Sequence, residues 1–296
     1  MPSHHILTPK IISRLNNLSL KARFVVEGFI VGLHKSPYHG FSVEFSEHRA
    51  YGAGDEIRHI DWKLWGKTDR FFIKQFEEET NLLTHLLVDQ SRSMDYSSHG
   101  MSKLEYAKIM SASLAYLMLK QQDAVGLTLF DSEIQDYLPP RSKSSHLNAL
   151  FSRLNRIQPG PETAIAPMLH KSAETIKKRG LIVLISDLFD NPEDVVSGLK
   201  HFRYKGHEVL VIHVLDPQEL ALKFNERTRF KDMETGEEII TEPWHIQKDY
   251  QESISSFCDY YKSICHKNKI VYILANTDTP LDSVLTEYLV KRKRIG

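Results

Sequence analysis

Five short apolar runs, separated by longer amphipathic segments, limit most strongly what this chain of 296 residues can fold into. They cover residues 82–88, 124–130, 181–185, 209–215 and 270–274. Each run has five to seven residues and shows little alternation of polar with apolar side chains. This is the pattern of strands that are buried on both faces of a parallel sheet.

The segments between the runs carry signals for helices. Ser102 and Glu105 form a capping box ahead of apolar residues at helical spacing. Asn191 is an N-cap residue followed by Pro192 in the first helical position. Strands that alternate with such helices predict an α/β fold, a doubly wound and mostly parallel sheet with helices on both faces.

The rhythm of strands and helices holds only for part of the chain. We assign residues 81–296 to this α/β domain and residues 1–80 to a small N-terminal annex, in which residues 8–24 are expected to form a short amphipathic helix. Residues 216–245 interrupt the rhythm with polar-mixed segments around Thr235 and Gly236, which predicts an exposed hairpin or insertion.

Composition restricts the possible partners and the compartment. Lys+Arg and Asp+Glu are equal at 38 each, so no overall charge favours nucleic acid, and the basic run at residues 291–294 is expected to be a solvated tail. No run of 18 apolar residues predicts a transmembrane segment, and the N-terminus lacks the apolar stretch of a signal peptide. We therefore expect a cytoplasmic protein, in which Cys258 and Cys265 are reduced.

A candidate metal site follows the first predicted strand. Asp89, Ser91 and Ser93 form the pattern D-x-S-x-S at the end of a strand, where open α/β sheets bind ligands. A second carboxylate, Asp187, follows the strand at residues 181–185, and Thr163 lies in the loop before the preceding helix. Hard oxygen donors of this kind suit Mg²⁺, with Mn²⁺ or Ca²⁺ as alternatives, and do not suit zinc. Each residue taken singly also fits a strand end or a helix cap.

This set of residues resembles the metal-ion-dependent adhesion site of von Willebrand factor type A domains. The resemblance implies that Ser91, Ser93 and Thr163 supply hydroxyls, and that Asp89 and Asp187 bind the ion directly or through water. The threonine loop departs from the usual pattern, because it reads Gly-Pro-Glu-Thr where type A domains commonly have Gly-Gly-Thr.

A second resemblance lies upstream of the motif. Residues 49–63, RAYGAGDEIRHIDWK, and residues 72–77, FIKQFE, resemble the signature of the bacterial family catalogued as domain of unknown function 58. That family joins the signature to a type A domain and is usually linked with MoxR-type AAA+ ATPases. The resemblance therefore implies a module without catalytic activity, an adaptor or co-chaperone that binds such an ATPase or another protein through an acidic side chain. Arg92, inside the motif loop, is placed to pair with that acidic group.

Two other functions compete with this one. A phosphohydrolase of haloacid dehalogenase type also places a nucleophilic aspartate at the end of its first strand, with carboxylates such as Asp187 and Asp190 nearby. Such enzymes need a second aspartate two residues after the nucleophile as general acid, and here that residue is Ser91, whose hydroxyl cannot serve. A nucleic-acid binder that uses the basic run at residues 291–294 with Trp62 and Trp65 is disfavoured by the balanced charge.

Overall fold

The core of the protein is a six-stranded sheet of order β10-β7-β6-β3-β4-β5. The computed structural model describes residues 8–35, 48–50, 52, 65–66, 68, 71–74, 82–98, 100–160, 164–233 and 236–295. The sheet strands are β3 (Leu83–Asp89), β4 (Ala124–Phe130), β5 (Ile134–Arg141), β6 (Leu181–Ser186), β7 (Glu208–Leu215) and β10 (Val271–Asn276). Neighbouring strands are parallel except for β5, which pairs antiparallel with β4 at one edge.

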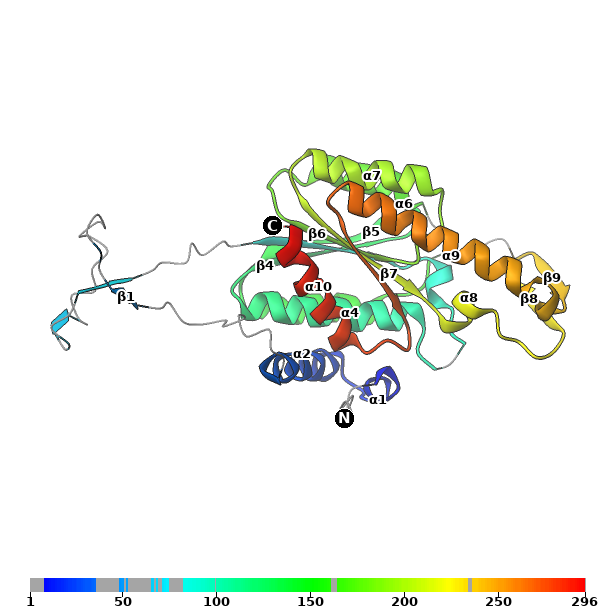
Figure 1. The fold of residues 1–296 in the computed structure, drawn as a ribbon, viewed down its shortest axis with the longest axis horizontal. Coiled ribbons are helices and arrows are strands. Elements are labelled where there is room, and N and C mark those ends of the chain that lie inside the picture. The colour runs from blue at the N-terminus through cyan, green and yellow to red at the C-terminus, as the bar shows by residue number, and fades with distance from the viewer. Residues whose placement is uncertain are drawn as a thin grey trace. The chain divides into compact units, whose positions relative to one another are not determined.

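Helices cover both faces of this sheet, as Figure 1 shows. On one face lie α6 (Ile165–Thr175), α7 (Pro192–Tyr204) and α9 (Pro243–Lys267), and on the other α4 (Lys103–Lys120) and α10 (Leu281–Ile295). A further helix, α5 (Ser145–Arg156), packs beside α4. The structure thereby confirms the predicted fold, a mostly parallel α/β sheet between two helical layers.

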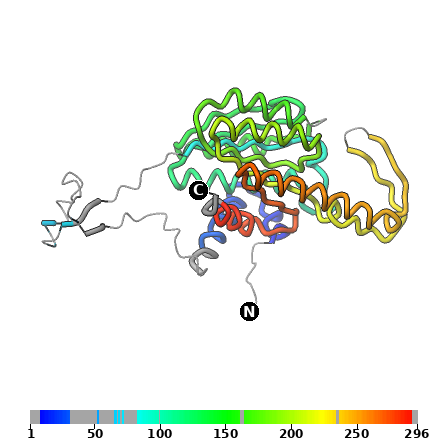
Figure 2. The backbone as a smooth tube through the Cα atoms, turned by 45° about the horizontal axis from the view of Figure 1, so that its top comes forward, coloured from blue at the N-terminus to red at the C-terminus, as the bar shows by residue number. Residues whose placement is uncertain are grey.

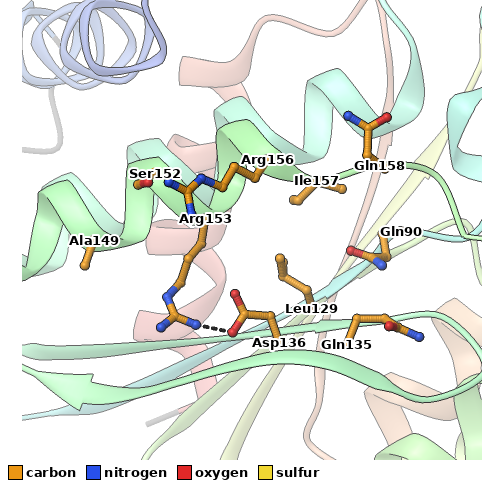
Figure 3. Close-up of a pocket in the computed structure, with 10 residues that line it drawn as sticks. All are labelled: Gln90, Leu129, Gln135, Asp136, Ala149, Ser152, Arg153, Arg156, Ile157 and Gln158. Atoms are coloured by element: carbon orange, nitrogen blue, oxygen red, sulfur yellow. Dashed lines mark hydrogen bonds and ion pairs between the residues drawn. The ribbon is translucent and has the colours of Figure 1, made fainter.

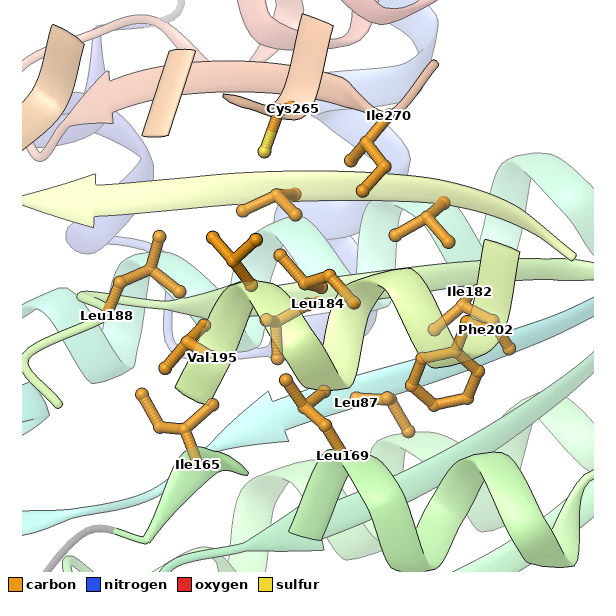
Figure 4. Close-up of a cluster of buried hydrophobic side chains, with 14 of the residues drawn as sticks. Leu87, Ile165, Leu169, Ile182, Leu184, Leu188, Val195, Phe202, Cys265 and Ile270 are labelled. Atoms are coloured by element: carbon orange, nitrogen blue, oxygen red, sulfur yellow. The ribbon is translucent and has the colours of Figure 1, made fainter. Parts of the chain in front are cut away.

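Apolar side chains fill the space between the sheet and the first of these layers (Figure 4). Leu87 and Leu184 from the sheet pack with Leu169 of α6 and Val195 of α7, and all four are fully buried. Strands β3, β4, β6 and β7, which correspond to four of the five apolar runs, are buried on both faces. The polar residues that follow these runs therefore lie at the edge of the sheet.

The N-terminal helix α1 (Pro9–Ser13) and all but the last three residues of α2 (Leu18–Lys35) belong with the α/β domain. Contacts group residues 1–32 with residues 82–296, and Nζ of Lys21 in α2 lies 2.6 Å from Oε1 of Glu105 in α4. The second boundary, between residues 81 and 82, lies within one residue of the predicted one, but residues 1–32 group with the α/β domain and not with the predicted annex. Within α2, apolar side chains such as Val25 and Val26 are buried.

Residues 33–81 form a second unit. Within it, strand β1 (His48–Ala50) pairs antiparallel with β2 (Phe72–Lys74). These short strands include the start of each of the two signature segments. Most of the signature between them, including Trp62, lies outside the described residues.

The interruption at residues 216–245 contains the short helix α8 (Pro217–Ala221) and a hairpin of strands β8 (Thr228–Lys231) and β9 (Glu238–Thr241). Gly236 has a φ of +77°, which few residues other than glycine tolerate. Figure 2 shows the hairpin beside the N-terminal end of α9, beyond the end of the sheet.

One buried histidine of β3 gives a test of this packing. His85 is 5% exposed, no group among the described residues hydrogen-bonds its Nδ1, and burial, aided by His207, lowers its pKa to about 4. The unfolded chain therefore binds a proton that the folded chain excludes, so stability is complete above pH 6.5 and falls as the pH drops toward 4. This linkage amounts to about 3 kcal/mol across that interval.

We expect His85→Leu to remove this share of the pH dependence, so that the variant exceeds the parent protein in stability at pH 5. Urea unfolding at pH 7.5 and pH 5 measures the difference. The exposed His266→Leu serves as the control and should leave the pH dependence unchanged. An unaltered slope in His85→Leu would show that His85 does not carry the linkage.

Candidate metal centre

Four neighbouring strands of the sheet each end in a buried aspartate. Asp89 closes β3, and Asp131, Asp187 and Asp216 directly follow β4, β6 and β7. Their exposed fractions are 0%, 2%, 0% and 0% respectively. Because β4, β3, β6 and β7 are adjacent and parallel, all four carboxylates lie along one edge of the sheet, which we call the carboxylate rim.

The Asp89 carboxylate accepts hydrogen bonds from two uncharged donors, a backbone N–H group and a hydroxyl. Oδ1 accepts a hydrogen bond from the backbone N–H of Ser91 (2.9 Å), and Oδ2 accepts one from the hydroxyl of Ser186 (2.6 Å). Burial, followed by the charge of Asp187, raises the pKa of Asp89 to about 7, although both hydrogen bonds act in the opposite direction. A carboxylate whose ionised form is disfavoured in this way gains stability when a cation is placed beside it.

The two motif hydroxyls lie next to each other. Oγ of Ser91 and Oγ of Ser93 are 3.0 Å apart, and Ser91 is fully buried whereas Ser93 is half-buried. Ser91 is the N-cap residue of a short 3₁₀ helix, η2 (Arg92–Asp95), and Ser93 lies within that helix. Adjacent oxygen ligands of an octahedral Mg²⁺ ion, each about 2.1 Å from the metal, lie about 3 Å apart. The spacing of the hydroxyls therefore fits two neighbouring ligands of one small cation.

Asp187 already has a cationic partner. Its Oδ2 accepts a hydrogen bond from Nζ of Lys103 at 2.8 Å, and both side chains are fully buried. The same ammonium lies 2.5 Å from Oε1 of Glu219 and 5.0 Å from the ring centre of Phe189. Burial opposes the charge of Lys103, but Asp187 and Glu219 outweigh it and raise the pKa of the ammonium.

Through Lys103, Asp187 is connected to Glu219, at the start of the insertion at residues 216–245. Glu219 belongs to α8, where its side chain and that of the N-cap residue Asp216 form a capping box. Asp216 also accepts hydrogen bonds from the backbone N–H and the hydroxyl of Ser98. The loop that follows the serine motif, the end of β6 and the start of α8 are thus joined by buried polar contacts.

Asp131 has its own donors at the opposite end of the rim. Its carboxylate accepts hydrogen bonds from the side-chain amides of Gln90 (3.3 Å) and Gln135 (2.8 Å) and from the backbone N–H of Glu133 (3.1 Å). A Cβ atom on Gly160 would lie 2.3 Å from Oδ2 of Asp131, so only glycine fits the chain where it passes this carboxylate.

The structure brings together Asp89, Ser91 and Ser93, and it places Asp187 at the end of the adjacent strand β6. Thr163, the fifth residue predicted for the site, lies outside the described residues. Among the residues that the structure describes, no three His, Cys, Asp or Glu side chains cluster so as to hold an ion. A cation at this rim would therefore depend on the serine hydroxyls.

Sequence reasoning missed three residues of this region. Asp131 and Asp216 could have been found from the sequence, because each directly follows a predicted apolar run, as Asp89 does. Lys103 was not, since the first residue of an amphipathic helix is ordinarily solvated, and here its side chain is fully buried.

Comparison with known proteins agrees with this architecture. The profile of the family described as "Protein of unknown function DUF58" matches residues 47–256. Uncharacterized proteins of Mycobacterium tuberculosis and Mycobacterium bovis are each 26% identical to this chain over 231 residues, which is 77% of this chain and 72% of the relative.

Two solved structures share the fold. BatB from Bacteroides thetaiotaomicron has a TM-score of 0.50 and 20% identity, and covers 72% of this chain and 99% of its own. An aerotolerance-related membrane protein from Bacteroides fragilis has the same TM-score of 0.50 and the same coverage, at 21% identity. In the described part of the present chain, no helix is both long and apolar enough to cross a membrane. Since the family match spans more than half of its length, the chain belongs to the DUF58 family.

Proposed function

We propose that this protein is a protein-interaction module that holds a divalent cation at the carboxylate rim. Asp89, Ser91 and Ser93 would hold the ion, Asp187 would act beside them, and Thr163 stays a predicted ligand. Mg²⁺ is the expected ion, with Mn²⁺ or Ca²⁺ as alternatives. When bound, it would supply a positive charge with coordination positions open to an acidic side chain of a partner.

One observation carries this proposal: Asp89 is the rim aspartate whose charge is least compensated. Asp187 is paired with Lys103, Asp216 receives donors from Ser98 and from the start of α8, and Asp131 receives two amides. Asp89 receives one hydroxyl and one N–H, and its pKa is raised to about 7. A cation beside the two serine hydroxyls would supply the missing charge.

Binding without catalysis suits these residues better than phosphoester hydrolysis does. Oδ2 of Asp190, a carboxylate that the phosphohydrolase alternative would use, accepts hydrogen bonds from the backbone N–H groups of Ile165 and Ala166 at the start of α6. A phosphohydrolase of this type needs a general acid two residues after Asp89. Ser91 occupies that position, and its hydroxyl is no general acid near neutral pH.

We propose a MoxR-type AAA+ ATPase as the partner, with this chain as its adaptor or co-chaperone in the cytoplasm. The support is the resemblance of the signature segments and of the serine motif to that group of proteins. Arg92 is exposed beside the motif serines, where its Nη1 donates to the carbonyl of Met233 at 3.5 Å, and we propose that its charge pairs with an incoming carboxylate.

Capture of the purified ATPase on the immobilised chain tests the proposal. We expect capture in Mg²⁺, loss of capture in EDTA, and loss in Ser93→Ala even when Mg²⁺ is present. Ser253→Ala, on the exposed side of α9, is the matched control and should capture the ATPase normally. Undiminished capture in EDTA and by Ser93→Ala would refute cation-mediated binding.

A further inference from the structure

A cavity with a mixed polar and apolar lining lies beside the carboxylate rim, between α5 and the sheet edge formed by β4 and β5 (Figure 3). Its volume is about 590 Å³, within the range of about 300–1,000 Å³ that is usual for ligand sites. Arg153 and Arg156 of α5 line one side, and Gln135 and Asp136 of β5 line the other. Leu129, Ala149 and Ile157 complete the lining, so charged and amide side chains stand beside an apolar floor.

The charges in the cavity are uneven. Arg153 forms an ion pair with Asp136, so these two charges largely cancel. Arg156 is exposed, and no carboxylate among the described residues is paired with it. The lining therefore keeps one uncompensated guanidinium, whose planar set of donors matches a carboxylate.

The cavity and the candidate metal centre share a wall. Gln90, which lines the cavity, lies in the chain between Asp89 and Ser91. Its carbonyl oxygen accepts a hydrogen bond from the backbone N–H of Gly160 (2.6 Å), and its side-chain amide donates to Asp131. Gln90 is thus held on both sides, and it joins the lining of the cavity directly to the serine motif along the chain.

We propose that the cavity receives an acidic peptide segment of the partner. In the partner's chain, this segment lies next to the acidic side chain that would bind the cation. Arg156 pairs with a second carboxylate of that segment, and the exposed side-chain amide of Gln158 is available to its backbone. This inference rests on the proposed function and extends it, because it makes the partner's motif a pair or run of acidic residues. A single acidic side chain would then bind less tightly.

Fluorescence anisotropy with a fluorescein-labelled peptide of six glutamates, in Mg²⁺, tests the inference. We expect Arg156→Gln to weaken binding of the peptide about tenfold, as the loss of one charge-assisted contact implies, and Arg156→Glu to weaken it further. Arg156 is exposed, so both variants should fold. Arg14→Gln, at the residue that follows α1, removes a charge of the same kind from an exposed position and should bind like the parent protein.

The outcomes separate this inference from the proposed function. If both Arg156 variants bind the peptide normally and EDTA still abolishes binding, the peptide does not use the cavity. That result overturns this inference and leaves the proposed cation site standing. If Arg156→Gln weakens binding of the peptide whereas EDTA and Ser93→Ala do not, the peptide binds in the cavity without a cation. That result supports this inference and contradicts the proposed function. Failure of the parent protein to bind the peptide at all overturns the inference. Calorimetric titration with Mg²⁺ alone should give the same affinity for Arg156→Gln as for the parent protein.

Discussion

Lys103→Met is expected to lower the free energy of unfolding by about 3–5 kcal/mol, the cost of removing one partner from a buried ion pair. Nζ of Lys103 lies within 2.8 Å of Asp187 and 2.5 Å of Glu219, and the Lys103 and Asp187 side chains are 0% exposed. Methionine fills similar space but leaves the fully buried Asp187 and the partly buried Glu219 without a cation. Urea unfolding in EDTA measures the loss at neutral pH.

A matched ion pair gives the control for this prediction. Lys21 and Glu105 approach to 2.6 Å, but their side chains keep exposed fractions of 11% and 36%. Because water still reaches Glu105, Lys21→Met should cost less than about 1 kcal/mol. In Lys103→Met/Asp187→Asn the deficit should shrink, since one stranded charge is gone. A cost for Lys103→Met no larger than that for Lys21→Met would contradict the role given to Lys103.

Asp89→Asn is expected to abolish divalent-cation binding and to leave the metal-free fold as stable as before, or more stable. Changes next to a metal ligand typically cost 10–100-fold in affinity, so loss of the ligand itself should cost more than about 100-fold. The ionised carboxylate is fully buried, and its pKa is raised to about 7, so asparagine removes a charge that the metal-free fold disfavours. The hydroxyl of Ser186, which now donates to Asp89, can accept a hydrogen bond from the new amide.

Affinity and stability should therefore change in opposite directions in this variant. Calorimetric titration with Mn²⁺ gives the first quantity, and thermal unfolding in EDTA at pH 8 gives the second. Asp249→Asn, on the exposed side of α9, should alter neither. A deficit in EDTA as large as that of Lys103→Met would show that the Asp89 charge is already compensated in the metal-free protein, and the proposal would lose its main support.

The sheet could be predicted largely from the sequence because its central strands are buried on both faces. The predicted run at residues 124–130 is strand β4, and the other four runs agree with β3, β6, β7 and β10 to within two residues at each end. Strand β5 was missed, since exposed and half-buried side chains alternate along it and Pro139 and Pro140 lie within it. Such prolines argue against a strand unless it lies at the edge of a sheet, where β5 is found.

Only the part of the candidate site that lies within one loop could be predicted with its spatial arrangement. Asp89, Ser91 and Ser93 are close in sequence, and their proximity in space follows from one turn. Lys103 contacts Asp187 and Glu219, which are 84 and 116 residues away in the chain. No local pattern relates residues so far apart, and only the strand order, with β6 between β3 and β7, brings them to one edge.

The most direct test of the central claim is an anomalous difference map at the manganese edge, from crystals of the protein soaked in Mn²⁺. We expect a peak beside the Asp89 carboxylate and the Ser91 and Ser93 hydroxyls, at about 2.2 Å from its ligand oxygens, with the Lys103–Asp187 ion pair kept or displaced toward Glu219. Manganese bound only elsewhere, with Asp89 still hydrogen-bonded to Ser186 and no peak at the serines, would contradict the central claim.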